Sequence, residues 1–217
     1  MQSDLHKRGR FPSRGMTRLA ASIKRLRNDH AGVAAVEFAM IVPIMLMMLI
    51  GCFECSQALT IDRRNTQIAS SVADLVARAP VAGLTSADVD ALMLIANQLM
   101  KPYSTTPLTV TVISVKAQTV NNALQIVVDW SRDNTAPGSM PLARNSTYAA
   151  LPPGLLLASG ESVIVTEAKY TYTPVAGASL FIQAAYDIKE TFYLKPRYSN
   201  CVHLLPINCG DGTYMGK

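Results

Sequence analysis

Residues 32–53 read GVAAVEFAMIVPIMLMMLIGCF, a run in which Glu37 is the one charged side chain. As an α-helix, Val33–Phe53 would extend about 31 Å at ~1.5 Å per residue, which is close to the thickness of the hydrocarbon layer of a membrane. Pro43 lies inside the run, and membrane helices tolerate the bend that a proline causes better than soluble helices do. A buried helix of a soluble protein seldom runs this long without a polar face. The run therefore predicts a membrane-spanning helix.

The charge around this run indicates its orientation. Residues 1–31 carry eight Lys and Arg against two Asp, a net of +6, and the whole chain carries +5, so residues 32–217 sum to −1. Because Lys and Arg beside a span stay in the cytoplasm, we expect the C-terminal part outside the cytoplasm, with the span in the inner (cell) membrane. A basic tail could also bind nucleic acid, but no stacking aromatic residues or binding motif accompany it, so no nucleic-acid partner is expected.

The four cysteines fall into two pairs. Cys201 and Cys209 lie in a turn-rich tail, NCVHLLPINCGDG, whose loop could bring the two sulfurs together. We therefore predict a disulfide between them in an oxidising compartment. Cys52 and Cys55 lie at the outer end of the span, where a bond between them would restrain little, and their redox state stays open. Bound metal is not expected, because one pair lies at a membrane boundary and His203 is the only nearby imidazole.

Beyond the span, the sequence predicts two helices. Residues 56–79 contain no proline or glycine, and apolar side chains recur mainly at three- and four-residue spacing. The membrane helix should therefore continue as an amphipathic stem, residues 54–79. Ser86 then provides an N-cap for a second helix, which should end before Pro102. The predicted apolar face of the stem consists of Leu59, Ile68, Val72, Leu75, Val76 and Ala79.

The pattern of apolar residues then changes from a helical to a two-residue period, which predicts strands. The turn residues Asn121 and Asn122 separate the first two strands, and a long polar segment, 133–160, separates the second from the third. The tyrosines and Trp130 within the strands are expected to pack in the core. The four predicted strands are residues 108–115, 124–131, 161–173 and 187–194.

These elements predict an α+β fold. An N-terminal transmembrane helix is extended by the amphipathic stem and followed by a small extracytoplasmic domain, which contains a helix and an antiparallel sheet of about four strands. The predicted boundaries are a basic cytoplasmic leader at 1–32, the span at 33–53, the stem at 54–79 and the extracytoplasmic domain at 80–217. The last part is large enough to bury a core of its own.

Residues 27–38 (RNDHAGVAAVEF) and the apolar run up to Gly51 and Glu54 resemble the TadE-like minor pseudopilins of tight-adherence (Flp-type) pilus systems. In that family, a short basic leader precedes a glycine, and a glutamate occupies the fifth position after the glycine. YTYTP (170–174) and LKPR (194–197) are similar to the last-strand features of the family. The leader is longer here than is typical, and methionine fills many positions where leucine is commoner.

The resemblance implies that a prepilin peptidase cleaves the chain after Gly32, so that the mature protein begins at Val33. The carboxylate of Glu37 in one subunit could then pair with the protonated α-amine of Val33 in its neighbour. The alternative is a plain membrane anchor with an incidental glutamate. Assembly contacts would come from Val36, Ala39, Met40 and Pro43. The implied partners are the peptidase, other pilus-assembly pseudopilins, inner-membrane platform proteins and the lipid bilayer, with no cofactor.

Two other processing signals remain open. Residues 49–52 (LIGC) match a lipobox, which would make Cys52 a lipidated N-terminus, and residues 56–58 (SQA) satisfy the small-residue rule for cleavage after Ala58. Either cut would leave a lipoprotein or a secreted envelope binding module. An enzyme is not expected, because the part of the chain after the span contains His203 as its only histidine and none of the common catalytic motifs.

Overall fold

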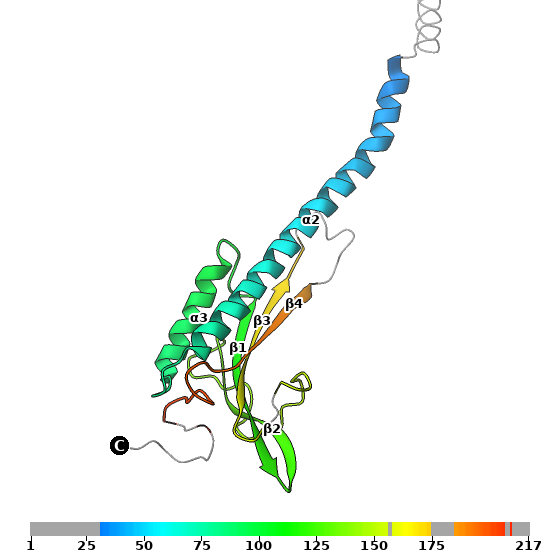
Figure 1. The fold of residues 1–217 in the computed structure, drawn as a ribbon. Helices are drawn as coiled ribbons and strands as arrows, with labels where there is room; N and C mark the ends of the chain where they lie inside the picture. The colour runs from blue at the N-terminus through cyan, green and yellow to red at the C-terminus, as the bar shows by residue number, and fades with distance from the viewer. Residues whose placement is uncertain (1–30, 156–157, 175–184, 207–208, 210–217) are drawn as a thin grey trace, which may run out of the picture. The chain divides into compact units, whose positions relative to one another are not determined.

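A computed structural model describes residues 31–155, 158–174, 185–206 and 209 (Figure 1). All but the last two residues of the predicted leader, 1–32, lie outside the described residues. The chain divides into two compact units, Met1–Ile50 and Gly51–Lys217. The elements are, in order, α2 (Ala31–Ala77), α3 (Ser86–Met100), β1 (Leu108–Val120), β2 (Ala123–Asp133), β3 (Ser162–Tyr172) and β4 (Tyr186–Leu194).

Helix α2 contains both the predicted membrane span and most of the predicted stem, and Pro43 lies inside it without ending it. In the first unit, the side chains of residues 32–50 are exposed or partly exposed, and none is buried. The helix is long and apolar enough to cross a membrane. The long apolar N-terminal helix predicted from the sequence is confirmed, and it is consistent with a single membrane span.

In the second unit, residues 51–77 of α2 bury one stripe against the sheet, and the predicted face of the stem is partly wrong. Leu59 and Leu75 are 57% and 40% exposed, whereas Ile61 is buried. Leu59 is nine residues from the buried Ile68, which is about two and a half turns, so its side chain points away from the core. The buried stripe consists of Glu54, Ile61, Asn65, Ile68, Ala69, Val72, Ala73, Val76 and Ala77.

Helix α3 begins one residue earlier than the predicted cap implied, because Thr85 and not Ser86 is the N-cap. The Thr85 hydroxyl accepts a hydrogen bond from the Asp88 N–H at 3.2 Å, and the Asp88 carboxylate accepts one from the Thr85 N–H at 2.8 Å. This capping box satisfies two free backbone donors. Hydrogen bonds from Thr85 hold the pKa of the Asp88 carboxyl below its usual range. The helix ends at Met100, before Pro102 as predicted.

The sheet has four antiparallel strands in the order β2-β1-β3-β4, which confirms the predicted α+β fold. β1 and β2 are longer than predicted and join through Asn121 and Asn122, whose φ values of 51° and 60° form the left-handed turn that suits a two-residue hairpin. The N–H of Val128 in β2 donates to the carbonyl of Ser146, which lies in the segment after β2, at 2.9 Å. The segment between β2 and β3 therefore covers part of the β2 edge.

The two faces of the sheet have separate cores. Residues of α2 and α3 pack with Trp130 and with one set of β1 and β3 side chains in the larger cluster. Trp130 is 1% exposed, and its indole N–H donates to the carbonyl of Val202 at 2.8 Å. On the other face, Val165 and its neighbours pack with Tyr148 and Leu151 from the segment after β2. Trp130 is therefore a packing residue, as predicted.

Candidate assembly helix

The predicted assembly residues lie on one continuous surface of α2. Residues three, four and seven positions apart are neighbours on a helix, so Ala39, Met40 and Pro43 lie on the same face as Val36. Val36 is 62% exposed and Met40 is 71% exposed. Glu37 borders this face, because it is three residues before Met40. The side chains on this surface are exposed.

Glu37 is the one charge among the apolar side chains of the first unit that the structure describes. It is exposed, and no described residue forms an ion pair with it. A carboxylate at the centre of a spanning helix is unfavourable by roughly 2.5–3.5 kcal/mol on insertion scales, and such groups usually have a partner. Val33, four residues earlier on the same face, is 51% exposed. The helix thus presents a carboxylate and an apolar face together, which can pair with a cation and pack against another helix.

In the second unit, Glu54 is a buried polar residue that sequence analysis treated only as the end of the apolar run. It is 5% exposed, and its Oε2 accepts a hydrogen bond from the Tyr172 hydroxyl at 2.5 Å. Burial and this hydrogen bond raise the pKa of Tyr172 above its usual range. The Tyr172 ring lies 5.5 Å from the ring of Tyr186. Glu54 thus ties the start of the stem to β3.

Arg64 and Asn65 make two further links that sequence analysis missed. The Arg64 guanidinium donates to the carbonyls of Leu99 and Lys101 at 2.8 and 2.6 Å, and so satisfies free acceptors at the end of α3. It also lies 5.4 Å from the Tyr103 ring centre. Asn65 is fully buried, and its Nδ2 donates to a β4 carbonyl at 3.0 Å. Asn65 could have been predicted as buried, because it stands four residues from Ile61 on the same stripe.

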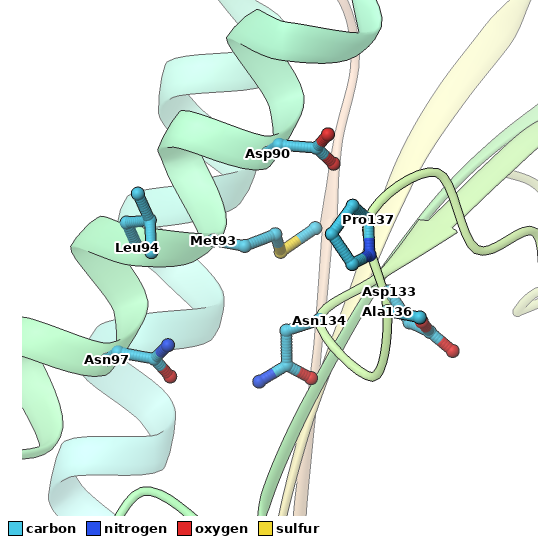
Figure 2. Close-up of a pocket in the computed structure, with 8 residues that line it drawn as sticks. All are labelled: Asp90, Met93, Leu94, Asn97, Asp133, Asn134, Ala136 and Pro137. Atoms are coloured by element: carbon cyan, nitrogen blue, oxygen red, sulfur yellow. The ribbon is translucent and has the colours of Figure 1, made fainter.

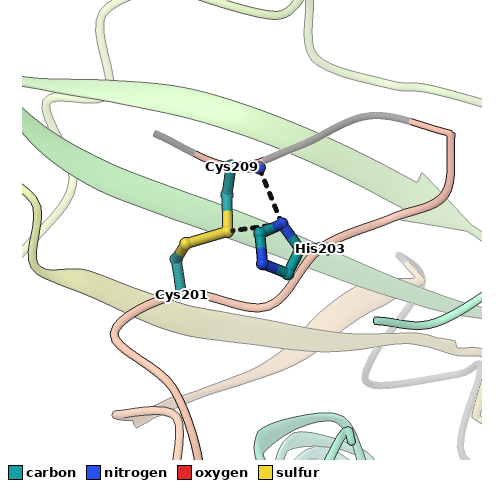
Figure 3. A group of neighbouring side chains, drawn as sticks. All are labelled: Cys201, His203 and Cys209. Carbon is teal, nitrogen blue, oxygen red and sulfur yellow. Dashed lines mark hydrogen bonds between the residues drawn. A yellow bond between two sulfur atoms is a disulfide. The ribbon is translucent and has the colours of Figure 1, made fainter. Parts of the chain in front are cut away.

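The predicted tail disulfide joins Cys201 and Cys209, whose Cα atoms are 6.1 Å apart. Figure 3 shows the ring of His203 beside it, with Nδ1 accepting a hydrogen bond from the Cys209 N–H at 3.0 Å. Zinc binds cysteine as a thiolate, so these sulfurs are not zinc ligands while they are bonded to each other. Cys52 and Cys55 are free and exposed.

A cavity of about 230 Å³ lies between α3 and the segment after β2 (Figure 2). Two of its polar side chains already serve the fold. The Asn134 side chain accepts a hydrogen bond from the N–H of Val110 and donates one to the carbonyl of Leu108, and Asp133 accepts from Thr135. The residues that line it include two carboxylates, Asp90 and Asp133, but no histidine, cysteine or hydroxyl side chain. The lining therefore supplies no side-chain nucleophile of the serine or cysteine type.

Comparison with known protein families gives a match to the long helix. Residues 32–78 match the protein family described as TadE-like protein, a segment that almost coincides with α2. No curated protein and no solved structure matches the chain. The match therefore concerns the long helix, and the sheet domain has no match of its own.

Proposed function

The chain belongs to the TadE-like protein family through residues 32–78, and we propose that it is a minor pseudopilin that is cleaved after Gly32. Family membership implies a role in the assembly of a tight-adherence (Tad) pilus, and members are generally assembly components rather than enzymes. In the proposed mechanism, cleavage releases the subunit into assembly. The helix that begins at Val33 then packs with helices of other subunits, and the sheet domain provides the specificity for partners.

One observation carries this proposal: residues 32–50 form an apolar helix with no buried side chain and with Glu37 as its one charge. Apolar surface of this extent requires lipid or protein to cover it. Prepilin-type cleavage would create an α-amine at Val33, mostly protonated at neutral pH because its ordinary pKa is about 8. An amine from one subunit and Glu37 from the next would then share the unfavourable desolvation of both charges.

The packing of α2 argues against the two other cleavage sites. A cut at Cys52 or after Ala58 would separate the membrane helix from the sheet domain inside a continuous helix. Cleavage after Ala58 would also remove Glu54 from the Tyr172 hydroxyl. A buried hydroxyl that loses its partner destabilises the fold by ~1–3 kcal/mol. The contacts of α2 therefore support processing at Gly32 over a lipoprotein or a secreted module.

We place the protein in the inner membrane as a single-pass protein with its N-terminus in the cytoplasm. The net charge of +6 in residues 1–31 supports this orientation, because basic residues beside a span stay in the cytoplasm. The Cys201–Cys209 disulfide also supports it, because disulfides persist in oxidising compartments outside the cytoplasm. The proposed partners are a prepilin peptidase, other pilus-assembly pseudopilins and platform proteins of the inner membrane, together with the lipid bilayer.

The proposal is tested by the intact mass and N-terminal sequence of the protein purified from native membranes. We expect a chain that begins at Val33, and a matched Gly32→Leu variant should keep the uncut mass. A lipid-modified Cys52 or a chain that begins at Leu59 would refute the proposal, because the mature protein would lack the membrane helix. An uncut wild-type chain would refute the processing step and leave a plain membrane anchor.

A further inference from the structure

We propose that a groove beside Tyr103 lies in the outer headgroup layer of the membrane and takes up a phospholipid. This proposal rests on the membrane span of the proposed function. The groove, called the Tyr103 groove, has a volume of about 420 Å³ and lies within the second unit. It is lined by Phe53, Gln57 and Ile61 of α2, by Tyr103, Ser104 and Pro107 of the α3–β1 connection, and by Tyr170, Thr171, Tyr172 and Thr173 at the end of β3.

The depth of the groove follows from the chain itself. Phe53 is the last residue of the apolar run, and both Phe53 and Gln57 line the groove. Four residues of helix rise by at most about 6 Å at ~1.5 Å per residue. A bilayer of ~40–45 Å with a hydrocarbon core of ~30 Å has headgroup layers of about 5–7 Å on each side. Gln57 therefore lies no more than about 6 Å beyond the end of the apolar run, which is the depth of the headgroup layer.

The lining of the groove is amphipathic and carries no formal charge among its residues. Tyrosine is enriched where membranes meet water, because its ring is apolar and its hydroxyl is polar. The Tyr103 hydroxyl donates to Gln57 Oε1 at 2.7 Å, so that α2 holds this side chain in place. Phe53 is 52% exposed and offers apolar surface, whereas Ser104 and Thr173 offer hydroxyls. Apolar surface beside hydroxyls suits the glycerol and phosphate region of a lipid.

The test uses the full chain in vesicles of phosphatidylethanolamine and phosphatidylglycerol that contain lipids with a nitroxide on the headgroup. A Tyr103→Trp variant places a fluorophore in the groove. Leu124→Trp is the matched control, because Leu124 is 44% exposed and lies opposite Thr119 near the far end of β1, about 36 Å from Leu108 at ~3.3 Å per residue. Leu46→Trp reports the span itself through lipids with brominated acyl chains. Trp130 is buried, so it adds the same background fluorescence to all three variants.

We expect a loss of fluorescence in Tyr103→Trp on adding the headgroup label, and no such loss in Leu124→Trp. Equal behaviour of these two variants, with Leu46→Trp quenched by the acyl bromines, would overturn the lipid proposal and leave the span intact. If Tyr103→Trp is shielded from both the lipid label and aqueous iodide, a protein occupies the groove and the proposal is wrong. If the brominated acyl chains do not quench Leu46→Trp, the membrane span, the proposed function and the lipid proposal are all wrong.

Discussion

The hydrogen bond between Glu54 and Tyr172 should contribute measurably to the stability of the sheet domain. Tyr172 is 6% exposed, and in Glu54→Ala its hydroxyl would lose this acceptor. A buried donor without a partner destabilises a fold by ~1–3 kcal/mol. For a domain of this size, about 2 kcal/mol lowers the melting temperature by roughly 4–8 °C. We therefore expect a drop of this size in Glu54→Ala.

The assay is thermal unfolding of the full chain in detergent micelles, followed by the fluorescence of Trp130. Trp130 lies in the same buried cluster as Tyr172, so it reports the unfolding of the sheet domain and not of the membrane helix. Tyr198→Phe is the matched control, because Tyr198 is 65% exposed and its loss of a hydroxyl should leave the melting temperature unchanged.

A double-mutant cycle separates this hydrogen bond from the other contacts of Glu54. Tyr172→Phe should also destabilise the domain, because the buried Glu54 carboxylate loses a donor. The double variant Glu54→Leu with Tyr172→Phe leaves neither group unpaired. The destabilisation of the two single variants, Glu54→Leu and Tyr172→Phe, should therefore exceed that of the double variant by about 1.5–3 kcal/mol. Single effects that simply add would refute the reasoning, because they would mean that the two side chains do not depend on each other.

Three further predictions concern other parts of the chain. Glu37→Ala should leave cleavage after Gly32 intact but weaken co-purification of pilus-assembly partners, with Glu37→Asp as the control that keeps the charge; unchanged recovery would contradict the pairing role. A maleimide should label Cys55, which lies beyond the span, in the intact protein, while labelling of the tail pair should require a reductant, as counted by mass. Burial and the nearby Glu167 raise the pKa of the Tyr148 hydroxyl to about 12. The unfolded chain loses this hydroxyl proton near its ordinary pKa of about 10, so the free energy of unfolding should fall as pH rises from about 10 to 12. Tyr148→Phe should lose less stability over that range in chemical unfolding, and an identical loss would show that Tyr148 does not contribute.

Local sequence patterns were sufficient to predict the elements of the fold. The run at 32–53 could only be a long apolar helix, because a span of that length and composition has no polar face to turn toward water. The four strands followed from two-residue alternation, and Asn121 and Asn122 marked their first turn because these residues adopt left-handed backbone angles readily. The pairing of Cys201 with Cys209 followed from a turn-rich segment between them. Each of these features depends on neighbours in the sequence.

Contacts between distant residues, in contrast, were decided by the tertiary structure alone. Leu59 was predicted as a core residue from its type and spacing, but it points away from the core. The face of α2 that packs against the sheet contains Ile61 instead. Glu54 was predicted only as the end of the apolar run, yet β3 brings the Tyr172 hydroxyl to it from 118 positions further along the chain. Arg64 likewise serves the end of α3. A polar residue is buried when a partner from another element satisfies its hydrogen bonds, and the sequence around it does not contain that partner.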